Sequence, residues 1–205
     1  MKLMKSLSEI DTISKRASKA AGFSWGIAEE IGKNTRLLEM FGLPGIKNLN
    51  YYFKLYKKHK FQNISMISKL NSSKISYCPI IAGVNFLDQI NILQELDEIT
   101  LENVACPVLF VPFLSRASEI VGKKILLNID KHIFLLNFNQ SIYSSYFDKK
   151  IWERAEKLKI SFLENNDLFS EIEWKEMYEL SEDTFVEETE ELKQTSAGAG
   201  LTDND

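Results

Sequence analysis

Three helical segments, each bounded by capping or stop residues, occupy the first 60 residues and constrain the fold most. Ser6 and Ser24 are suited to cap helix N-termini, because their hydroxyls can accept a free backbone N–H. Gly22 and the Gly-Leu-Pro-Gly stretch at 42–45 are typical helix stops. The helices expected from these capping and stop residues span residues 6–20, 25–41 and 46–56. The chain therefore begins as a helical layer.

Shorter apolar runs, separated by turn residues, follow residue 61. Runs at 124–129 and 132–138, with Asp130-Lys131 between them, predict a β-hairpin. The run 108–111 lies between prolines, which favours a short or edge strand. The other expected elements are an extended 75–81, a helix from Asn85 or Asp88 to about Leu96, a helix at 115–121, a helix at 148–155, a strand at 160–163 and a helix capped by Ser170.

This order of elements predicts an α+β fold, in which a helical N-terminal layer packs on a small mixed or antiparallel sheet. An acidic C-terminal helix and a Gly-rich tail are expected to follow the sheet. We expect a single domain over residues 1–205. Its subregions are a helical part (1–60), a mixed α/β part (61–169) and the acidic helix with the tail (170–205).

Charge is distributed unevenly along the 205 residues. Residues 1–60 hold 12 basic and 5 acidic side chains, whereas residues 161–205 hold 2 and 14. The two poles are expected to neutralise each other in one fold or across an interface, so the expected partners are a second copy or another protein subunit. No apolar run approaches the roughly 20 residues that a bilayer span requires, and the N-terminus lacks an apolar signal region. We therefore expect a cytoplasmic protein without a membrane partner.

The two cysteines, Cys78 and Cys106, are expected to be free thiols in a reducing compartment. Either thiol with His132 is an alternative nucleophile and base pair, although small buried thiols are the more usual case. Lysines and aromatics interleave at 51–60, which can hold nucleic acid. The spacing instead indicates an apolar helix face with a Lys-rich end, so we expect no nucleic-acid partner.

The stretch 24–30, Ser-Trp-Gly-Ile-Ala-Glu-Glu, is the first candidate site. Trp25 with Glu29, four residues later on the same helical face, is suited to form the wall of a small pocket, and Gly26 is suited to close approach of a ligand or backbone. Alternatively, Trp25 belongs to the core and Glu29 pairs with Lys33 on the surface. Glu29 and the adjacent Glu30 cannot easily share one target, since successive residues are turned by about 100°.

Ser115-Arg116 is a second candidate, expected where a strand ends and a helix begins. Backbone N–H groups and a guanidinium can hold an anion at such a junction.

The segments 7–10, 20–30, 42–45 and 197–205 (the last Ala-Gly-Ala-Gly-Leu-Thr-Asp-Asn-Asp) together resemble the beginning and end of a bacterial family catalogued only as a domain of unknown function. The resemblance implies no activity, but it directs attention to both ends of the chain. Members of that family often carry Ser-Arg shortly before the Gly-Ala-Gly segment, where this chain has Lys-Gln-Thr at 193–195.

The tail is the third candidate site. Thr202, Asp203, Asn204 and Asp205 offer hard oxygen donors that suit Mg²⁺ or Ca²⁺, whereas a flexible terminus is the simpler reading. No metal ligand is assigned.

The sequence as a whole predicts a protein that binds or acts on a small anionic metabolite, with the reaction unassigned. The pocket is expected to include Trp25, Glu29 and Arg116, with the tail as a further contributor. The alternative is a non-catalytic partner or assembly subunit of a metabolic complex.

Overall fold

The computed structural model describes residues 5–146, 148, 150–164 and 166–184. The chain divides into two compact units, residues 1–165 and 166–205, and each is described by itself. This division does not test the expected single domain over 1–205, which stays a prediction.

The three N-terminal helices are confirmed to within about one residue: α1 (Leu7–Ala20), α2 (Trp25–Met40) and α3 (Gly45–Tyr56). The predicted N-caps of α1 and α2 are present. Ser6 Oγ accepts a hydrogen bond from Glu9 N at 3.1 Å, and Ser24 Oγ accepts one from Ile27 N at 3.4 Å. Helices α1 and α2 form a closely packed hairpin, since a Cβ added at Gly32 of α2 would lie 2.8 Å from the backbone oxygen of Asp11.

The six strands that the structure describes form one mixed sheet, and this confirms the α+β class. They are β1 (Leu70–Asn71), β2 (Ile99–Ala105), β3 (Lys124–Ile129), β4 (His132–Leu136), β5 (Ile142–Ser144) and β6 (Arg154–Leu163). Their order is β1-β2-β6-β3-β4-β5, with β1 parallel to β2 and all other neighbours antiparallel. The two shortest strands therefore lie at the two edges.

The predicted hairpin is confirmed as β3 and β4. Asp130 lies in its turn with φ of 51°, a conformation that aspartate tolerates better than most residues. The Asp130 carboxylate also accepts hydrogen bonds from the backbone N–H groups of Glu156 and Lys157, at 3.1 and 3.0 Å. This one side chain thus fixes the turn against β6.

The run at 108–111 is not a strand. Residues Pro107–Leu109 form a 3₁₀ turn, and α6 follows at Val111–Val121. Both Pro107 and Pro112 lie in the first turn of a helix, where the missing N–H costs nothing, rather than flanking a strand. The predicted stop of α6 at Gly122 is confirmed, with φ of 66°.

Other boundaries in the middle of the chain also differ from expectation. Part of the expected extended segment 75–81 is present, since Tyr77 makes parallel bridges to Gln62 and Val104, but residues 79–81 belong to α4 (Pro79–Asp88). The helix expected from 85 or 88 to 96 begins earlier, as α4, and is followed by a separate α5 (Ile90–Leu93). The cause is Cys78, whose sulfur accepts a hydrogen bond from Ile81 N at 3.4 Å and caps α4. The helix predicted at 148–155 is wrong as well, because residue 154 begins β6.

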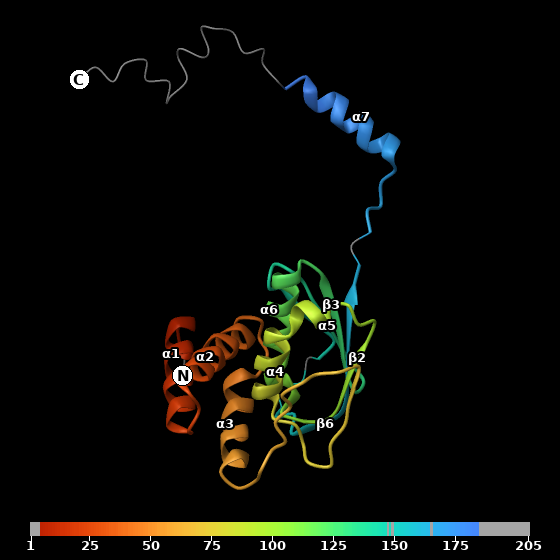
Figure 1. Ribbon diagram of the computed structural model, residues 1–205. Helices are drawn as coiled ribbons and strands as arrows, with labels where there is room; N and C mark the ends of the chain where they lie inside the picture. Colours follow the sequence, from red (N-terminus) through yellow and green to blue (C-terminus); the bar gives the residue numbers. More distant parts are fainter. Residues whose placement is uncertain (1–4, 147, 149, 165, 185–205) are drawn as a thin grey trace, which may run out of the picture. The chain divides into compact units, whose positions relative to one another are not determined.

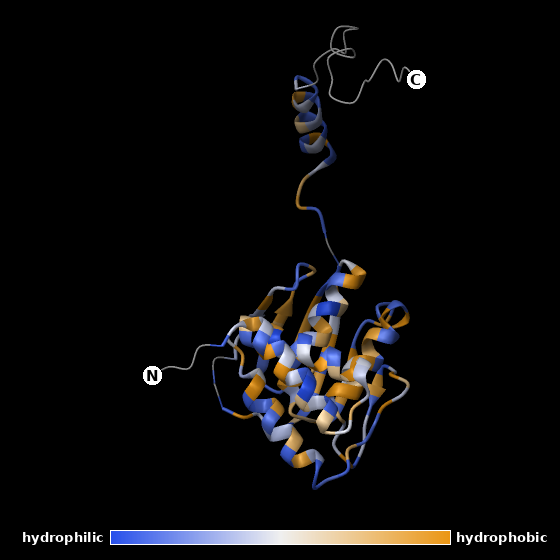
Figure 2. Ribbon diagram, turned by 90° about the vertical axis from the view of Figure 1, so that its left-hand side faces the viewer, coloured by the Kyte–Doolittle hydropathy of each residue, from blue (hydrophilic) through white to orange (hydrophobic). Residues whose placement is uncertain are grey.

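The helices of the first unit gather on one side of the sheet (Figure 1), and a view from that side places them in front of the strands (Figure 2). Helix α6 contacts β3 and β4, whereas α2 contacts α4 and α6. Helices α4 and α6 approach closely at Gly83, where an added Cβ would lie 2.2 Å from the ring of Phe113. The largest fully buried side chains of this core are aromatic: Tyr52, Phe86, Phe110, Phe113 and Phe134.

The second unit contains α7 (Glu171–Glu182), and its predicted cap is confirmed. Ser170 Oγ accepts from Glu173 N at 3.2 Å, while Ser170 N donates to the Glu173 carboxylate at 2.7 Å. This reciprocal pair is a capping box.

Candidate functional site

A groove runs along the hairpin of α1 and α2, with a volume of about 530 Å³. We call it the α1–α2 groove. It is lined by Ser8, Asp11, Thr12, Lys15, Arg16, Trp25 and Arg36. Three of these side chains are cationic and one is anionic, so the lining carries a net positive charge.

Trp25 is the apolar wall of this groove. Its side chain is 57% exposed, so the interpretation as a core residue is wrong and the interpretation as a pocket wall gains support. Lys15 Nζ and Lys19 Nζ lie 5.9 and 5.4 Å from the centroid of the indole, within the range of cation–π attraction. The indole therefore holds two ammonium groups at one end of the groove.

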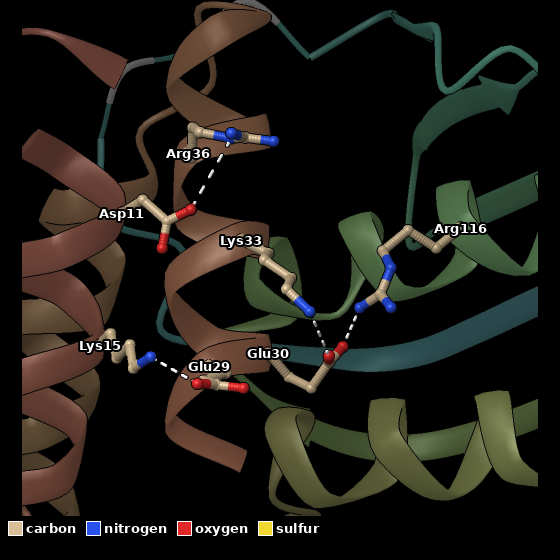
Figure 3. Close-up of polar contacts among 7 residues, drawn as sticks. All are labelled: Asp11, Lys15, Glu29, Glu30, Lys33, Arg36 and Arg116. Carbon is tan, nitrogen blue, oxygen red and sulfur yellow. Dashed lines mark hydrogen bonds and ion pairs between the residues drawn. The ribbon is translucent and has the colours of Figure 1, made fainter. Parts of the chain in front are cut away.

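Ion pairs partly neutralise the groove, as Figure 3 shows. Lys15 Nζ lies 2.5 Å from Glu29, and Arg36 lies 3.9 Å from Asp11. The Lys15 ammonium lowers the pKa of the Glu29 carboxyl through this hydrogen bond. Arg16, by contrast, has no ion pair with any residue that the structure describes. Arg16 is thus the lining cation with the most freedom to meet an anion.

Gly26 does not serve close approach of another backbone segment. A Cβ added there would meet no protein atom within 4 Å, so that alternative is wrong, while the glycine leaves open space beside α2 and close approach of a ligand stays a prediction. The expected pair of Glu29 with Lys33 is also wrong. Lys33 lies 3.3 Å from Glu30 instead, because Glu29 turns toward Lys15 of α1.

Arg116 joins α6 to α2 through Glu30, as Figure 3 shows. Both side chains are partly buried, and Glu30 thereby faces α6 while the neighbouring Glu29 faces α1. This geometry confirms that the two adjacent glutamates do not share one target. Arg116 is already paired with a carboxylate, so an incoming anion would have to compete with Glu30.

Ser115 and Arg116 lie inside α6, not at the junction of a strand and a helix. The prediction is wrong because α6 begins at Val111, so the free backbone N–H groups of its first turn lie four residues before those expected at Ser115. Ser115 is fully buried, and its hydroxyl has no hydrogen-bond partner among the described residues. The predicted anion site at 115–116 is therefore not formed by a helix N-terminus.

Both cysteines are free and buried, as predicted. Cys78 Sγ lies 3.0 Å from the hydroxyl of Tyr52, and burial raises the pKa of the Cys78 thiol. Burial, with a smaller effect of Glu153, raises the pKa of Cys106 to about 12. A thiol with a raised pKa is a poor nucleophile, because the thiolate is the reactive form.

His132 also lacks the environment of a base paired with a thiol. Its ring lies edge-on to Tyr146 and Trp152, at centroid distances of 5.2 and 5.1 Å. These contacts and the buried thiols disfavour the alternative nucleophile and base pair.

Two further predictions lie wholly or partly outside the described residues. Thr202, Asp203, Asn204 and Asp205 are not among them, so the Mg²⁺ or Ca²⁺ site stays a prediction. Within the described ranges, no group of three or more His, Cys, Asp or Glu side chains is arranged to hold a metal ion. In the same ranges, no helix combines the length and apolar character that crossing a bilayer requires.

The sequence did not single out Arg16, Arg36 or Asp11. A signal for them was present, since Ser8, Asp11, Thr12 and Lys15 recur at helical spacing and form one polar side of α1. That pattern is typical of any solvated helix face. Only the structure, which places Trp25 of α2 against this polar side of α1, shows that the side lines a groove.

No curated protein and no solved structure gives a significant match to this chain. Residues 5–78, from just before α1 to the cap of α4, match the model of one family. These residues include every lining side chain of the α1–α2 groove. The similarity of the 197–205 segment lies outside the match. The resemblance read from the sequence is confirmed over residues 5–78, and the family that they match is described as "Protein of unknown function (DUF3726)".

Proposed function

We propose that the α1–α2 groove binds the anionic group of a small metabolite, with no reaction assigned. The observation that carries this proposal is an exposed tryptophan beside a lining with three cations, Lys15, Arg16 and Arg36. Small-molecule sites are typically concave, with aromatic side chains beside a few polar groups that fix the orientation of the ligand, and this groove combines both. The indole would pack against the body of the ligand, and the cations would meet its charge.

Arg16 is the residue that we assign to the anion. Lys15 and Arg36 each have a carboxylate partner, whereas Arg16 has none among the described residues. A guanidinium can bind a carboxylate or phosphate through two parallel hydrogen bonds, each charge-assisted. The ligand class is therefore a small phosphate monoester or a carboxylic acid with an apolar or planar body. The two free thiols suit a reducing compartment, so we propose that the protein acts in the cytoplasm.

Isothermal titration calorimetry of the full chain tests the proposal, with citrate, pyrophosphate and adenosine monophosphate as probes. Arg16→Gln is expected to weaken binding of a positive probe by roughly tenfold or more, since a hydrogen bond to a charged group contributes about 1.5–3 kcal/mol. Trp25→Ala is expected to weaken it most for the probe with a planar body. Lys131→Gln removes one positive charge from an exposed turn and serves as the matched control.

Equal binding by wild type, Arg16→Gln and Trp25→Ala would refute the assignment of this groove. Native mass spectrometry of the freshly purified protein supplies the identity of the ligand. A co-purified molecule that is lost in Arg16→Gln but kept in Lys131→Gln supports the proposal independently of the chosen probes.

A further inference from the structure

Helix α7 is built to be helical without help from a core. Its N-terminus has the capping box of Ser170 and Glu173, and Phe169 stacks on Trp174 at a centroid distance of 5.4 Å. Phe169 precedes the cap and Trp174 is the fourth helical residue, which is the arrangement of a hydrophobic staple. An isolated helix of 12 residues is nevertheless marginal in water. The caps therefore preform a helix that gains full stability only against another surface.

The helix presents an apolar side that the residues described at 166–184 leave largely exposed. Trp174, Met177 and Tyr178 have the i, i+3, i+4 spacing that places them on one face, and they are 59, 65 and 55% exposed. No residue of α7 is buried, and Figure 2 shows both apolar and polar colour along it. This is the pattern of a helix that docks into a groove through a few apolar anchors.

The charge of α7 defines the chemistry of that groove. Residues 166–184 contain seven acidic side chains and one basic side chain, a net charge of −6. Only Lys175 interrupts the acidic surface, and it lies 3.7 Å from Glu179. The complementary surface must therefore have an apolar floor and a cationic rim.

The C-terminal end of α3 has both properties. A groove of about 340 Å³, which we call the α3 groove, is lined by Tyr51, Leu55, His59, Lys60, Phe61, Ile75, Ser76, Ala105, Glu153 and Arg154. Tyr51, Leu55, Phe61 and Ile75 supply a floor with room for an aromatic anchor. Lys60 and Arg154 supply cations, and neither has an ion pair with any residue in the described ranges.

The surroundings of the α3 groove add further positive charge. Lys54, Lys57 and Lys58 are exposed on the same end of α3, and none is ion-paired with a described residue. Residues 41–60 contain five lysines and no acidic side chain. A second groove, beside β5, is lined by Phe41, Gly42, Leu43, Ile142, Tyr143, Ser144, Tyr146 and Asp148, with an acid and no cation. A third, lined by Glu39, Gly42, Leu43, Pro44, Ile46 and Lys47, has one acid and one cation and no aromatic side chain. The α3 groove combines an aromatic floor with two cations, Lys60 and Arg154, against one acid, Glu153, so its charge and floor favour it.

We propose that α7 of a second copy of this chain docks in the α3 groove, so that two copies associate by reciprocal exchange of α7. Trp174 enters the groove above Leu55 and Phe61, and the acidic side of the helix meets Lys60 and Arg154. Each copy has one helix and one groove, so a pair with two-fold symmetry satisfies both grooves and closes the assembly. The inference goes beyond the proposed ligand site, because it uses residues outside the α1–α2 groove.

Sedimentation velocity of the full chain over a hundredfold range of concentration tests the association. The wild type is expected to form a dimer whose dissociation constant rises with added salt, because the contact is rich in charge. Trp174→Ser removes the anchor, and Lys60→Glu with Arg154→Glu reverses the rim. Each change is expected to raise the dissociation constant at least tenfold, as loss of an interface hot spot does.

Mixing the two variants gives the sharpest outcome. The Trp174→Ser copy keeps an intact groove, and the Lys60→Glu/Arg154→Glu copy keeps an intact α7. A mixture of two monomeric variants is therefore expected to form a mixed dimer through one docked helix. Lys124→Glu with Lys131→Glu reverses two exposed charges on the β3–β4 hairpin and serves as the control, with wild-type association expected.

Three results would overturn the proposal: a wild type that stays monomeric at every concentration, a dimer unaffected by both variants, or variants that do not associate when mixed. Circular dichroism of each variant shows whether it keeps its fold. The substituted side chains are exposed, so the first unit is expected to keep its fold. Trp174 also stacks on Phe169, so Met177→Ser, which leaves that contact intact, is the second test of the docked face. It is expected to raise the dissociation constant with an unchanged helical signal. Probe binding at the α1–α2 groove is expected to be unchanged in all of them, which separates failure of this proposal from failure of the ligand site.

Discussion

Two helical glycines allow a matched test of how α4 and α6 pack. Replacement of Gly83 by alanine places a Cβ 2.2, 2.3 and 2.7 Å from three ring atoms of Phe113. Phe113 is almost fully buried, so its ring has no free space to move into. Replacement of Gly26 by alanine adds the same methyl group to α2, where no atom lies within 4 Å.

Both substitutions gain from the higher helix propensity of alanine, but only Gly83→Ala overpacks the core. Alanine is more favourable than glycine in a helix by up to about 1 kcal/mol, and the gain is smaller in the first turn, where Gly26 lies. Overpacking of a core costs typically about 1–3 kcal/mol. We expect the upper part of that range at Gly83, because the added atom overlaps a ring rather than the end of a flexible chain. The free energy of unfolding should therefore rise by about 0.5 kcal/mol in Gly26→Ala and fall by about 1–2 kcal/mol in Gly83→Ala.

Urea unfolding followed by circular dichroism measures both changes. With an m-value of about 2 kcal/mol/M, the two unfolding midpoints should differ by roughly 1 M. The double variant Gly83→Ala/Phe113→Leu removes the ring, so the two changes should couple favourably by at least about 1 kcal/mol. Equal midpoints for the two alanine variants, or strictly additive effects in the cycle, would show that α4 and α6 do not approach at Gly83.

Three other predictions concern buried polar groups. Arg116→Met should lower the free energy of unfolding by about 1–3 kcal/mol by leaving Glu30 without its guanidinium, and adding Glu30→Gln should restore most of the loss in thermal melts. Asn34→Leu should raise the free energy of unfolding by about 1–3 kcal/mol, because both polar atoms of the Asn34 amide are buried with no partner among the described residues and leucine has the same branching. A lower melting temperature of this variant would contradict the prediction. The raised pKa of Cys106 keeps its thiol neutral in the folded state while the unfolded thiol ionises near pH 9. The free energy of unfolding should therefore fall as pH rises from about 9 to 12, by up to about 1.4 kcal/mol per pH unit. Urea midpoints measured at about pH 8 and about pH 10 should differ less in Cys106→Ala than in the wild type.

Local signals predicted the elements whose ends are set by local chemistry. Ser6, Ser24 and Ser170 each accept the backbone N–H three residues ahead, so their helices could be placed from sequence alone. The β3–β4 hairpin was predicted because both strands and the turn are adjacent in the chain. In each case the residues that determine the structure lie within a few positions of one another.

Elements that depend on distant partners were missed. The start of strand β6 was read as the end of a helix, because Ile151, Trp152 and Ala155 follow Asp148 at helical spacing. Residues 154–163 are extended because they pair with β2 on one side and β3 on the other. Neither partner strand is adjacent to β6 in the chain, so local spacing could not show this pairing.

The candidate site also has features set by local sequence and features set by distant partners. Trp25 and Glu29 were singled out from their spacing, and both belong to the α1–α2 hairpin. Whether Trp25 and Arg116 would line one pocket depended on tertiary structure. Arg116 pairs with Glu30 and is not among the residues that line the α1–α2 groove with Trp25. Sequence spacing places side chains on a helix face, but it does not show which neighbouring helix covers that face.

The short strands at both edges of the sheet affect how the protein behaves at high concentration. An exposed edge is a row of unpaired N–H and C=O groups onto which another chain can add a strand, which leads to aggregation. Here β1 offers two residues and β5 offers three, whereas the ten-residue β6 lies between β2 and β3 with both of its sides paired. The longest strand is thus paired on both sides, and each edge offers only a short row of free backbone groups to another chain.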